Sequence, residues 1–226
     1  MSETNDEKKL NKSLRLLTKS SIIMLIGLFL SKILTYVYRI IIARSFEPRI
    51  YGLFSLAVIF VSTFSIFASL GLDSGILRFV SFYRGRNEKD KNRYLFRFSF
   101  KVMFITSFIC GILLFFLSDV ISTGIFRDAA LSIFLKYFGI FLPAITLVGI
   151  FWSIIKAHEE IGWYSFLTNI LSMVLQVLIL LVLVFLNLDV KAIIFSYTFG
   201  FLGIFIASIL VCKYKIPEIF EKEHIN

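Results

Sequence analysis

The stretch that decides the fold runs from Ile161 to Leu188 and reads IGWYSFLTNILSMVLQVLILLVLVFLNL. Its 28 residues include no Asp, Glu, Lys or Arg. A helix needs about 20 apolar residues to cross the hydrocarbon core of a bilayer, whereas a strand of a membrane barrel alternates polar and apolar residues. The stretch therefore predicts a transmembrane helix.

Similar segments lie along the rest of the chain. Four of them, residues 51–72, 102–118, 137–155 and 192–212, are free of charged residues over 17 to 22 positions. A further apolar segment, residues 20–43, is equally long but contains two bases. With polar helix ends included, the sequence predicts an all-α membrane protein whose six spans lie at about 20–43, 51–82, 98–118, 134–155, 165–187 and 192–212.

The composition excludes an ordinary soluble domain. The chain is 58% hydrophobic and 17% charged, whereas soluble domains are roughly 45–50% apolar and about 25% charged. The net charge of +9 could indicate a nucleic-acid partner, but the bases crowd at the ends of the apolar segments, so we expect no nucleic-acid binding. Cys110 and Cys212 lie inside apolar segments, which predicts small buried hydrophobes rather than a disulfide.

The distribution of Lys and Arg predicts the orientation. Sixteen of these bases lie in the N-terminal segment, the connections after the second and fourth spans, and the C-terminal segment, whereas five lie in the other connections. Cytoplasmic loops carry the excess of positive charge, so both termini are expected in the cytoplasm. Residues 1–19 are then a basic cytoplasmic tail and residues 213–226 a second one.

The first span contains charges that are costly in a membrane. Lys32 lies near its midpoint and Arg39 follows seven residues later, on the same helix face as Thr35 and Tyr36. One interpretation is a structural ion pair with Asp73, the sole acid within the predicted spans. Because one acid neutralises only one base, a water-filled, positively charged cavity is the preferred interpretation.

Two other spans carry polar stripes. The second has serines and an acid at helical spacing, followed by Arg78, and the fifth has four polar residues in its first half, the last of which is Gln176. Small and polar residues of this kind often serve helix packing and interhelical hydrogen bonds, so packing and cavity lining both remain open.

The sequence offers no motif for catalysis, a cofactor or a metal. His158, Glu159 and Glu160 are consecutive, so on a helix they point in different directions and make a poor ligand set. A solvated helix end is the favoured interpretation. We therefore expect a protein that is not an enzyme and needs no cofactor.

Two blocks, ARSFEPRIYGLFSLAVIF from Ala43 and ASLGLDSGILRFVSFYRGRNEKDKNR from Ala68, resemble a known family. They are similar to the polysaccharide biosynthesis and O-antigen flippase branch of the multidrug/oligosaccharidyl-lipid/polysaccharide exporter superfamily. The residues that match its motifs are Ala43, Arg44, Pro48, Tyr51, Gly52, Gly71, Leu72, Arg78, Tyr83 and Gly85. The usual glycine of the first turn is Glu47 in this chain.

The resemblance implies an architecture. Members have twelve to fourteen helices in two lobes, so this chain would supply one lobe. We expect its partners to be the lipid bilayer, a lipid-linked oligosaccharide, and a second lobe from a separate chain or a second copy. A fragment is the remaining alternative.

The resemblance also implies a function, the flipping of a polyprenyl-pyrophosphate-linked oligosaccharide for cell-surface polysaccharide biosynthesis, and a location in the plasma membrane. Substrate-binding candidates are Lys32, Tyr36, Arg39, Arg44, Arg78 and Gln176. The alternatives are a lobe of an ion-coupled multidrug exporter, an inactive or truncated half-transporter, and, least favoured, a membrane-embedded prenyl-phosphate transferase. The exporter would need acids in its cavity, and the transferase would need paired carboxylates at the cytoplasmic surface.

Overall fold

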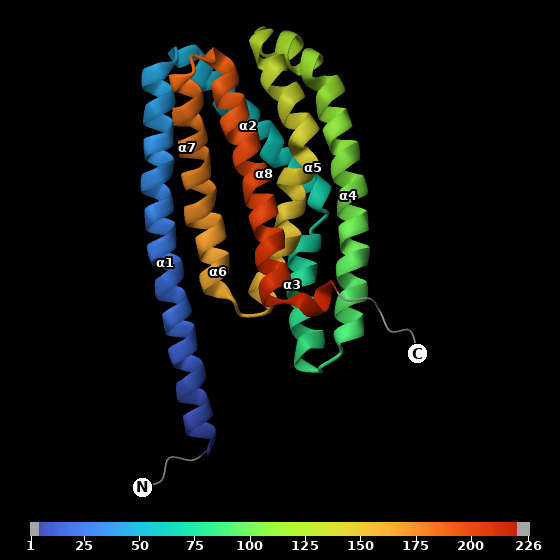
Figure 1. The fold of residues 1–226 in the computed structure, drawn as a ribbon. Coiled ribbons are helices and arrows are strands. Elements are labelled where there is room, and N and C mark those ends of the chain that lie inside the picture. Colours follow the sequence, from blue (N-terminus) through green and yellow to red (C-terminus); the bar gives the residue numbers. More distant parts are fainter. Residues whose placement is uncertain (1–4, 221–226) are drawn as a thin grey trace.

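The computed structural model describes residues 5–220, and the described part is a bundle of long helices without strands (Figure 1). In chain order its helices are α1 (Asn5–Ser45), α2 (Pro48–Ser69), α3 (Leu72–Gly85), α4 (Lys89–Asp119), α5 (Ala130–Ala157), α6 (Ile161–Ser165), α7 (Ser172–Phe185) and α8 (Asp189–Lys215). A π-helical segment, Val120–Ile125, continues α4, and a second one, Phe166–Leu171, joins α6 to α7. A short 3₁₀ turn, Pro217–Ile219, follows α8.

Six helical segments of the described chain are long and apolar enough to cross a membrane. They are Thr18–Ser45, Pro48–Ser69, Lys89–Ile125, Ala130–Ala157, Ile161–Phe185 and Asp189–Lys215. The prediction of an all-α membrane protein with six spans is confirmed, and the chain is a multi-pass membrane protein.

The first and last segments of the chain differ from simple tails. Residues from Asn5 onward already belong to α1, so much of the stretch predicted as a basic tail continues the first membrane helix. At the other end α8 extends to Lys215, and residues 221–226 of the predicted C-terminal tail lie outside the described residues.

The predicted second span, residues 51–82, is divided into two helices. Leu70 and Gly71 have φ values of 49° and 71°, both in the left-handed region that ends a helix. Thr106 on α4 donates a hydrogen bond of 2.6 Å to the carbonyl of Ala68, which would otherwise lack its helical partner at the end of α2. A cross-helix hydrogen bond thus supports the break, and such a contact is not visible in local sequence.

The centre of the bundle is α5, which contacts α2, α3, α4 and α8. In its membrane segment 61% of the residues are buried, and Phe134, Phe138 and Leu142 are fully enclosed. Gly111 on α4 and Gly139 on α5 bring these two backbones into direct contact, because a Cβ on Gly111 would lie 2.5 Å from the Gly139 carbonyl oxygen. A backbone contact of this kind is how small residues hold membrane helices together.

The outermost helix is α1, which lies along α6 and α7 at one edge of the bundle (Figure 1). Only 6% of the residues in an apolar 18-residue stretch of this helix are buried. Its tightest described contact is at Gly27, where an added Cβ would clash with the Ser165 hydroxyl. Most of the surface of α1 is thus left free to meet lipid or another protein.

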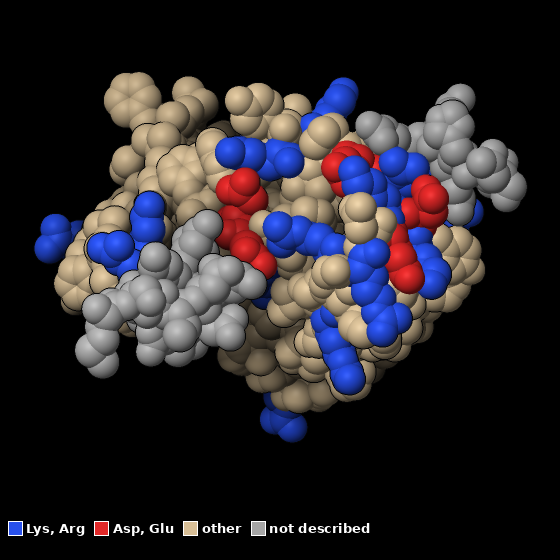
Figure 2. Space-filling view, turned by 90° about the horizontal axis from the view of Figure 1, so that it is seen from below, with Lys and Arg blue, Asp and Glu red and all other residues tan. Residues whose placement is uncertain are grey.

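Charged side chains gather at the end of the bundle where α3 ends and α4 begins (Figure 2). Ion pairs join the segments at this end: Lys89 Nζ lies 2.8 Å from Glu218 Oε1, and Arg84 Nη1 lies 3.7 Å from Glu159 Oε1. At the opposite end, Arg49 donates two hydrogen bonds to Asp128, of 2.8 and 2.9 Å. This pair holds the start of α2 to the segment before α5.

Candidate functional site

A cavity of about 390 Å³ opens within the membrane-spanning part, between α1, α2, α7 and α8. Four helices that are distant in sequence contribute to its wall. The lining residues are Thr35, Tyr38, Arg39, Tyr51, Phe54, Ser55, Val58, Ile59, Met173, Gln176, Tyr197 and Phe201. Two of the residues predicted from sequence, Arg39 and Gln176, therefore meet in one cavity although 137 positions separate them in the chain.

Arg39 is the source of charge in this cavity. Of the described residues that line it, Arg39 alone is charged. Its side chain is exposed, and no carboxylate of the described residues forms an ion pair with it. A guanidinium is always protonated and presents several donors in a planar fork, which suits phosphate oxygens. The cavity can thus offer an unpaired cation to an anionic group.

Gln176 on α7 supplies an amide to the cavity wall. Its side chain is buried, with 3% of its surface exposed. It lies across α8 at Gly200, where an added Cβ would clash with Gln176 Cγ and would stand 3.4 Å from its Cα. A residue larger than glycine at position 200 would therefore displace the amide that lines the cavity.

The rest of the wall is mainly aromatic. Phe54 and Tyr197 pack edge to face at 5.8 Å between ring centroids, and Tyr197 and Phe201 lie 4.9 Å apart. The hydroxyl of Tyr38 shares a hydrogen bond of 2.9 Å with Ser196, which fixes that ring. Because these rings contact one another, the wall is held in shape before any ligand enters.

Small polar groups interrupt this aromatic surface. Thr35 donates to the carbonyl of Ser31 at 2.7 Å, and Ser55 donates to the carbonyl of Tyr51 at 2.9 Å. Both hydroxyl oxygens keep acceptor capacity after these bonds. A cation, an amide, hydroxyls and aromatic rings in one cavity match the chemistry of a sugar attached to a phosphate.

The other predicted site residues lie outside this cavity. Lys32 and Tyr36 share the helix face of Arg39 but are exposed on α1, and Tyr36 shows 68% of its surface. Arg44 is exposed in the last turn of α1, and Arg78 is exposed on α3. Of the four bases among the substrate-binding candidates, only Arg39 therefore lines this cavity.

The structural ion pair considered for these bases is not formed between described residues. Asp73 instead lies against α5, where a Cβ on Gly149 would be 2.7 Å from its Oδ1. Neither Lys32 nor Arg39 has a carboxylate within ion-pair distance.

Three tyrosines line the cavity, and only Tyr51 is named from the sequence, as a residue that matches the family motif. Tyr38 and Tyr197 were not singled out, although Tyr197 stands between Ser196 and Thr198 in an apolar span. Tyrosine carries a hydroxyl that needs a partner when it is buried, so a tyrosine next to small polar residues within a membrane span is a usable signal.

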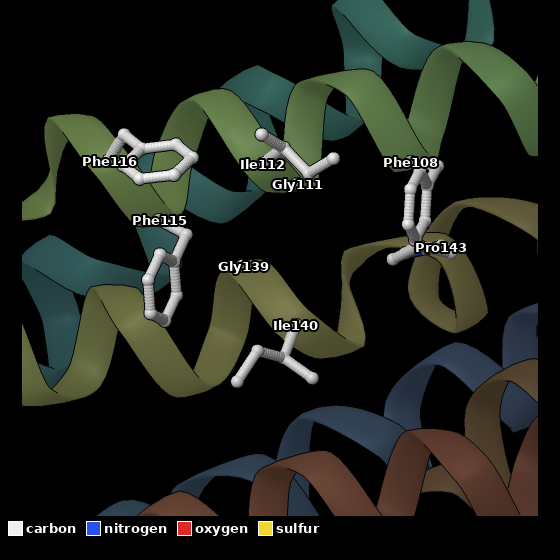
Figure 3. Close-up of a pocket in the computed structure, with 8 residues that line it drawn as sticks. All are labelled: Phe108, Gly111, Ile112, Phe115, Phe116, Gly139, Ile140 and Pro143. Carbon is white, nitrogen blue, oxygen red and sulfur yellow. The ribbon is translucent and has the colours of Figure 1, made fainter.

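Two other cavities have different chemistry. A groove of about 170 Å³ between α4 and α5 is lined by apolar residues, with Phe108, Phe115 and Phe116 around the Gly111–Gly139 contact (Figure 3). A polar cavity of about 370 Å³ lies at the charged end of the bundle, but its charged residues include the paired Lys89 and Glu218. The first offers nothing to an anion, and the second is occupied by ion pairs between segments.

Among the described residues there is no metal site. No group of three or more His, Cys, Asp or Glu side chains lies close enough together there to hold a metal ion. The cavity between α1, α2, α7 and α8 holds no acid and no histidine among its described lining residues. Its side chains are suited to binding and orientation.

The comparison with family models identifies the protein class. A model described as "Polysaccharide biosynthesis protein" matches residues 17–225, nearly the whole chain. The chain belongs to this family, as the motifs around Arg44 and Arg78 predicted, and its role lies in polysaccharide biosynthesis and export. Searches of curated proteins and of solved structures found no match.

Proposed function

We propose that the chain is one lobe of a flippase that moves a polyprenyl-pyrophosphate-linked oligosaccharide across the plasma membrane. The observation that carries this proposal is the cavity that joins Arg39 to Gln176 and to aromatic rings within the membrane-spanning part. A pyrophosphate does not enter hydrocarbon unaccompanied, because transfer of a charge into a low-dielectric medium costs many kcal/mol. A flippase therefore has to offer a cation along its path.

Different residues of the cavity would bind different parts of this substrate. Arg39 would bind the pyrophosphate, while Gln176 and the tyrosine rings would contact the first sugar. The prenyl chain would stay in the surrounding lipid. The lining charge favours this anionic lipid over an organic cation, the cargo of a multidrug exporter, because Arg39 would repel a cationic drug.

The exposed bases of α1 and α3 fit the same proposal. Lys32 and Arg78 would face a shared cavity between this lobe and a second one, and Arg44 would lie at its outer mouth. The small buried fraction of α1 supports a second lobe on this side, since most of the helix surface is available. The charged end of the bundle shown in Figure 2 would face the cytoplasm, in line with the excess of Lys and Arg in its connections. Transport in such an assembly proceeds as the lobes rock about the bound substrate.

The test is export of surface polysaccharide by cells that depend on this protein. Arg39→Gln should reduce export about tenfold or more, because a charge-assisted hydrogen bond contributes about 1.5–3 kcal/mol. Lys32→Gln should also reduce export, and Lys191→Gln, at an exposed position near the start of α8, serves as the control that should not. Unchanged export by Arg39→Gln and Lys32→Gln at normal protein level would refute the cationic path.

A further inference from the structure

Asp73 lies in the first turn of α3, two residues after the break that separates this helix from α2. The break falls inside the predicted second span, and α5 packs against both α2 and α3 there. Asp73 therefore lies at a joint between two helices, four residues beyond the end of the membrane-spanning segment Pro48–Ser69.

The carboxyl group of Asp73 is incompletely satisfied. Its Oδ1 is buried and has no hydrogen-bond partner. The same oxygen lies against the backbone of α5, because Gly149 has no side chain to keep it away. In the described part of the chain no base forms an ion pair with this carboxyl group.

The polar groups around Asp73 come from three helices. Ser69 at the end of α2 donates to the carbonyl of Ile66 at 3.0 Å, and the same hydroxyl is also placed to hydrogen-bond the Asp73 carboxyl group. Thr106 on α4 donates to the carbonyl of Ala68. Lys156 on α5 is the charged group that acts on Asp73 through space. It lies two turns beyond Gly149, and its ammonium stands 4.8 Å from the ring of Tyr164.

Burial disfavours the ionised carboxylate of Asp73 more strongly than the Ser69 hydroxyl and the Lys156 charge favour it. Buried groups of this kind take up a proton and become neutral, because burial disfavours the charged form. A protonated carboxyl group can instead lie against the α5 backbone at a small cost.

We propose that Asp73 is a proton-binding site. The proposal rests on three features that lie together: the joint between α2 and α3, the buried Oδ1 without a hydrogen bond, and Gly149 on α5, against which this oxygen lies. The proton is held while α3 lies against α5, as in this structure. When α3 moves away from α5 and water reaches Asp73, the O–H bond breaks, the proton passes to water and the carboxylate remains on α3.

The joint has the geometry for such a movement. The end of α2 is tied to α4 through Thr106, whereas α3 begins after two residues with left-handed backbone, Leu70 and Gly71. Rotation at these two residues would separate α3 from α5 without disturbing α2. A link between proton release and substrate movement rests on the proposed function, but proton binding itself does not.

The experiment is infrared spectroscopy of the full chain in lipid bilayers, titrated without substrate. The wild-type protein should keep a protonated carboxyl band at pH values above about 5, where ordinary aspartates are ionised. Asp73→Asn should remove the band, and Glu159→Gln, at a side chain that is 80% exposed, should leave it unchanged. Absence of the band in the wild type, or its persistence in Asp73→Asn, would overturn the proposal.

A second variant guards against a folding defect in Asp73→Asn. Lys156→Gln removes the positive charge that favours the carboxylate, so the band should persist to higher pH than in the wild type. An unchanged titration in Lys156→Gln would contradict the assigned site. The titration contains no substrate, so its outcome does not depend on the proposed function. The polysaccharide export assay tests that function independently.

Discussion

Substitution of Gly111 by alanine tests the contact that holds α4 against α5. The new Cβ would stand 2.5 Å from the Gly139 carbonyl oxygen, whereas ordinary contact begins at 3.4 Å. Neither partner is a flexible side chain, so the two backbones have to separate. Overpacking of this kind costs about 1–3 kcal/mol. In Gly139→Ala the corresponding distance, to the Gly111 carbonyl oxygen, is 3.0 Å, so a smaller loss is expected.

The matched control is Gly52→Ala on α2, where an added Cβ meets nothing within 4 Å. All three variants gain the same helix propensity, up to about 1 kcal/mol, so differences between them report the contact alone. The free energy of unfolding is measured in mixed micelles as the fraction of denaturing detergent is raised. Gly52→Ala is expected to be the most stable of the three variants, Gly139→Ala the next, and Gly111→Ala the least stable. Equal stability of Gly111→Ala and Gly52→Ala would refute a backbone contact between α4 and α5.

Two further predictions concern other parts of the bundle. Gly200→Ala should displace the Gln176 amide and reduce polysaccharide export at normal protein level, and unchanged export would show that this amide takes no part. Burial lowers the pKa of His158 from its usual 6.5, although the bond of its Nδ1 to the Ile154 carbonyl opposes the shift. The folded protein then binds fewer protons than the unfolded chain, so the free energy of unfolding should fall as pH drops through the unfolded pKa. His158→Gln should flatten this dependence between pH about 7 and 5 in the same unfolding assay, and an unaltered slope would assign it to another group.

The spans were predictable because hydrocarbon imposes a length and an absence of charge that sequence displays directly. The stretch from Ile161 to Leu188 leaves no other interpretation, and α6 and α7 occupy it. The break at Leu70 and Gly71 was not predictable, since a single glycine within an apolar segment is a weak signal. It depends on Thr106, which lies 36 residues beyond Leu70.

The candidate site was predictable only in part, because sequence shows which residues share a helix face but not which helices pack around them. Helical periodicity placed Lys32, Tyr36 and Arg39 on one face, but it does not fix how far along that face the neighbouring helices extend. Arg39 is exposed like Lys32 and Tyr36, but it alone of the three lines the cavity together with residues of α2 and α7. Gln176 was identified from its polar stripe, while its place in the same cavity as Arg39 depends on tertiary packing, including the close approach of α8 at Gly200.

The most direct measurement of the central claim is the affinity of the purified chain, in lipid nanodiscs, for a short polyprenyl pyrophosphate and for the matching polyprenol. The two ligands share their apolar chain, so the ratio of their dissociation constants reports recognition of the pyrophosphate. The account predicts that the wild-type protein and Lys191→Gln prefer the pyrophosphate, and that Arg39→Gln lowers this preference about tenfold, or roughly 1.4 kcal/mol. Equal binding of the two ligands by the wild type, or an undiminished preference in Arg39→Gln, would contradict it.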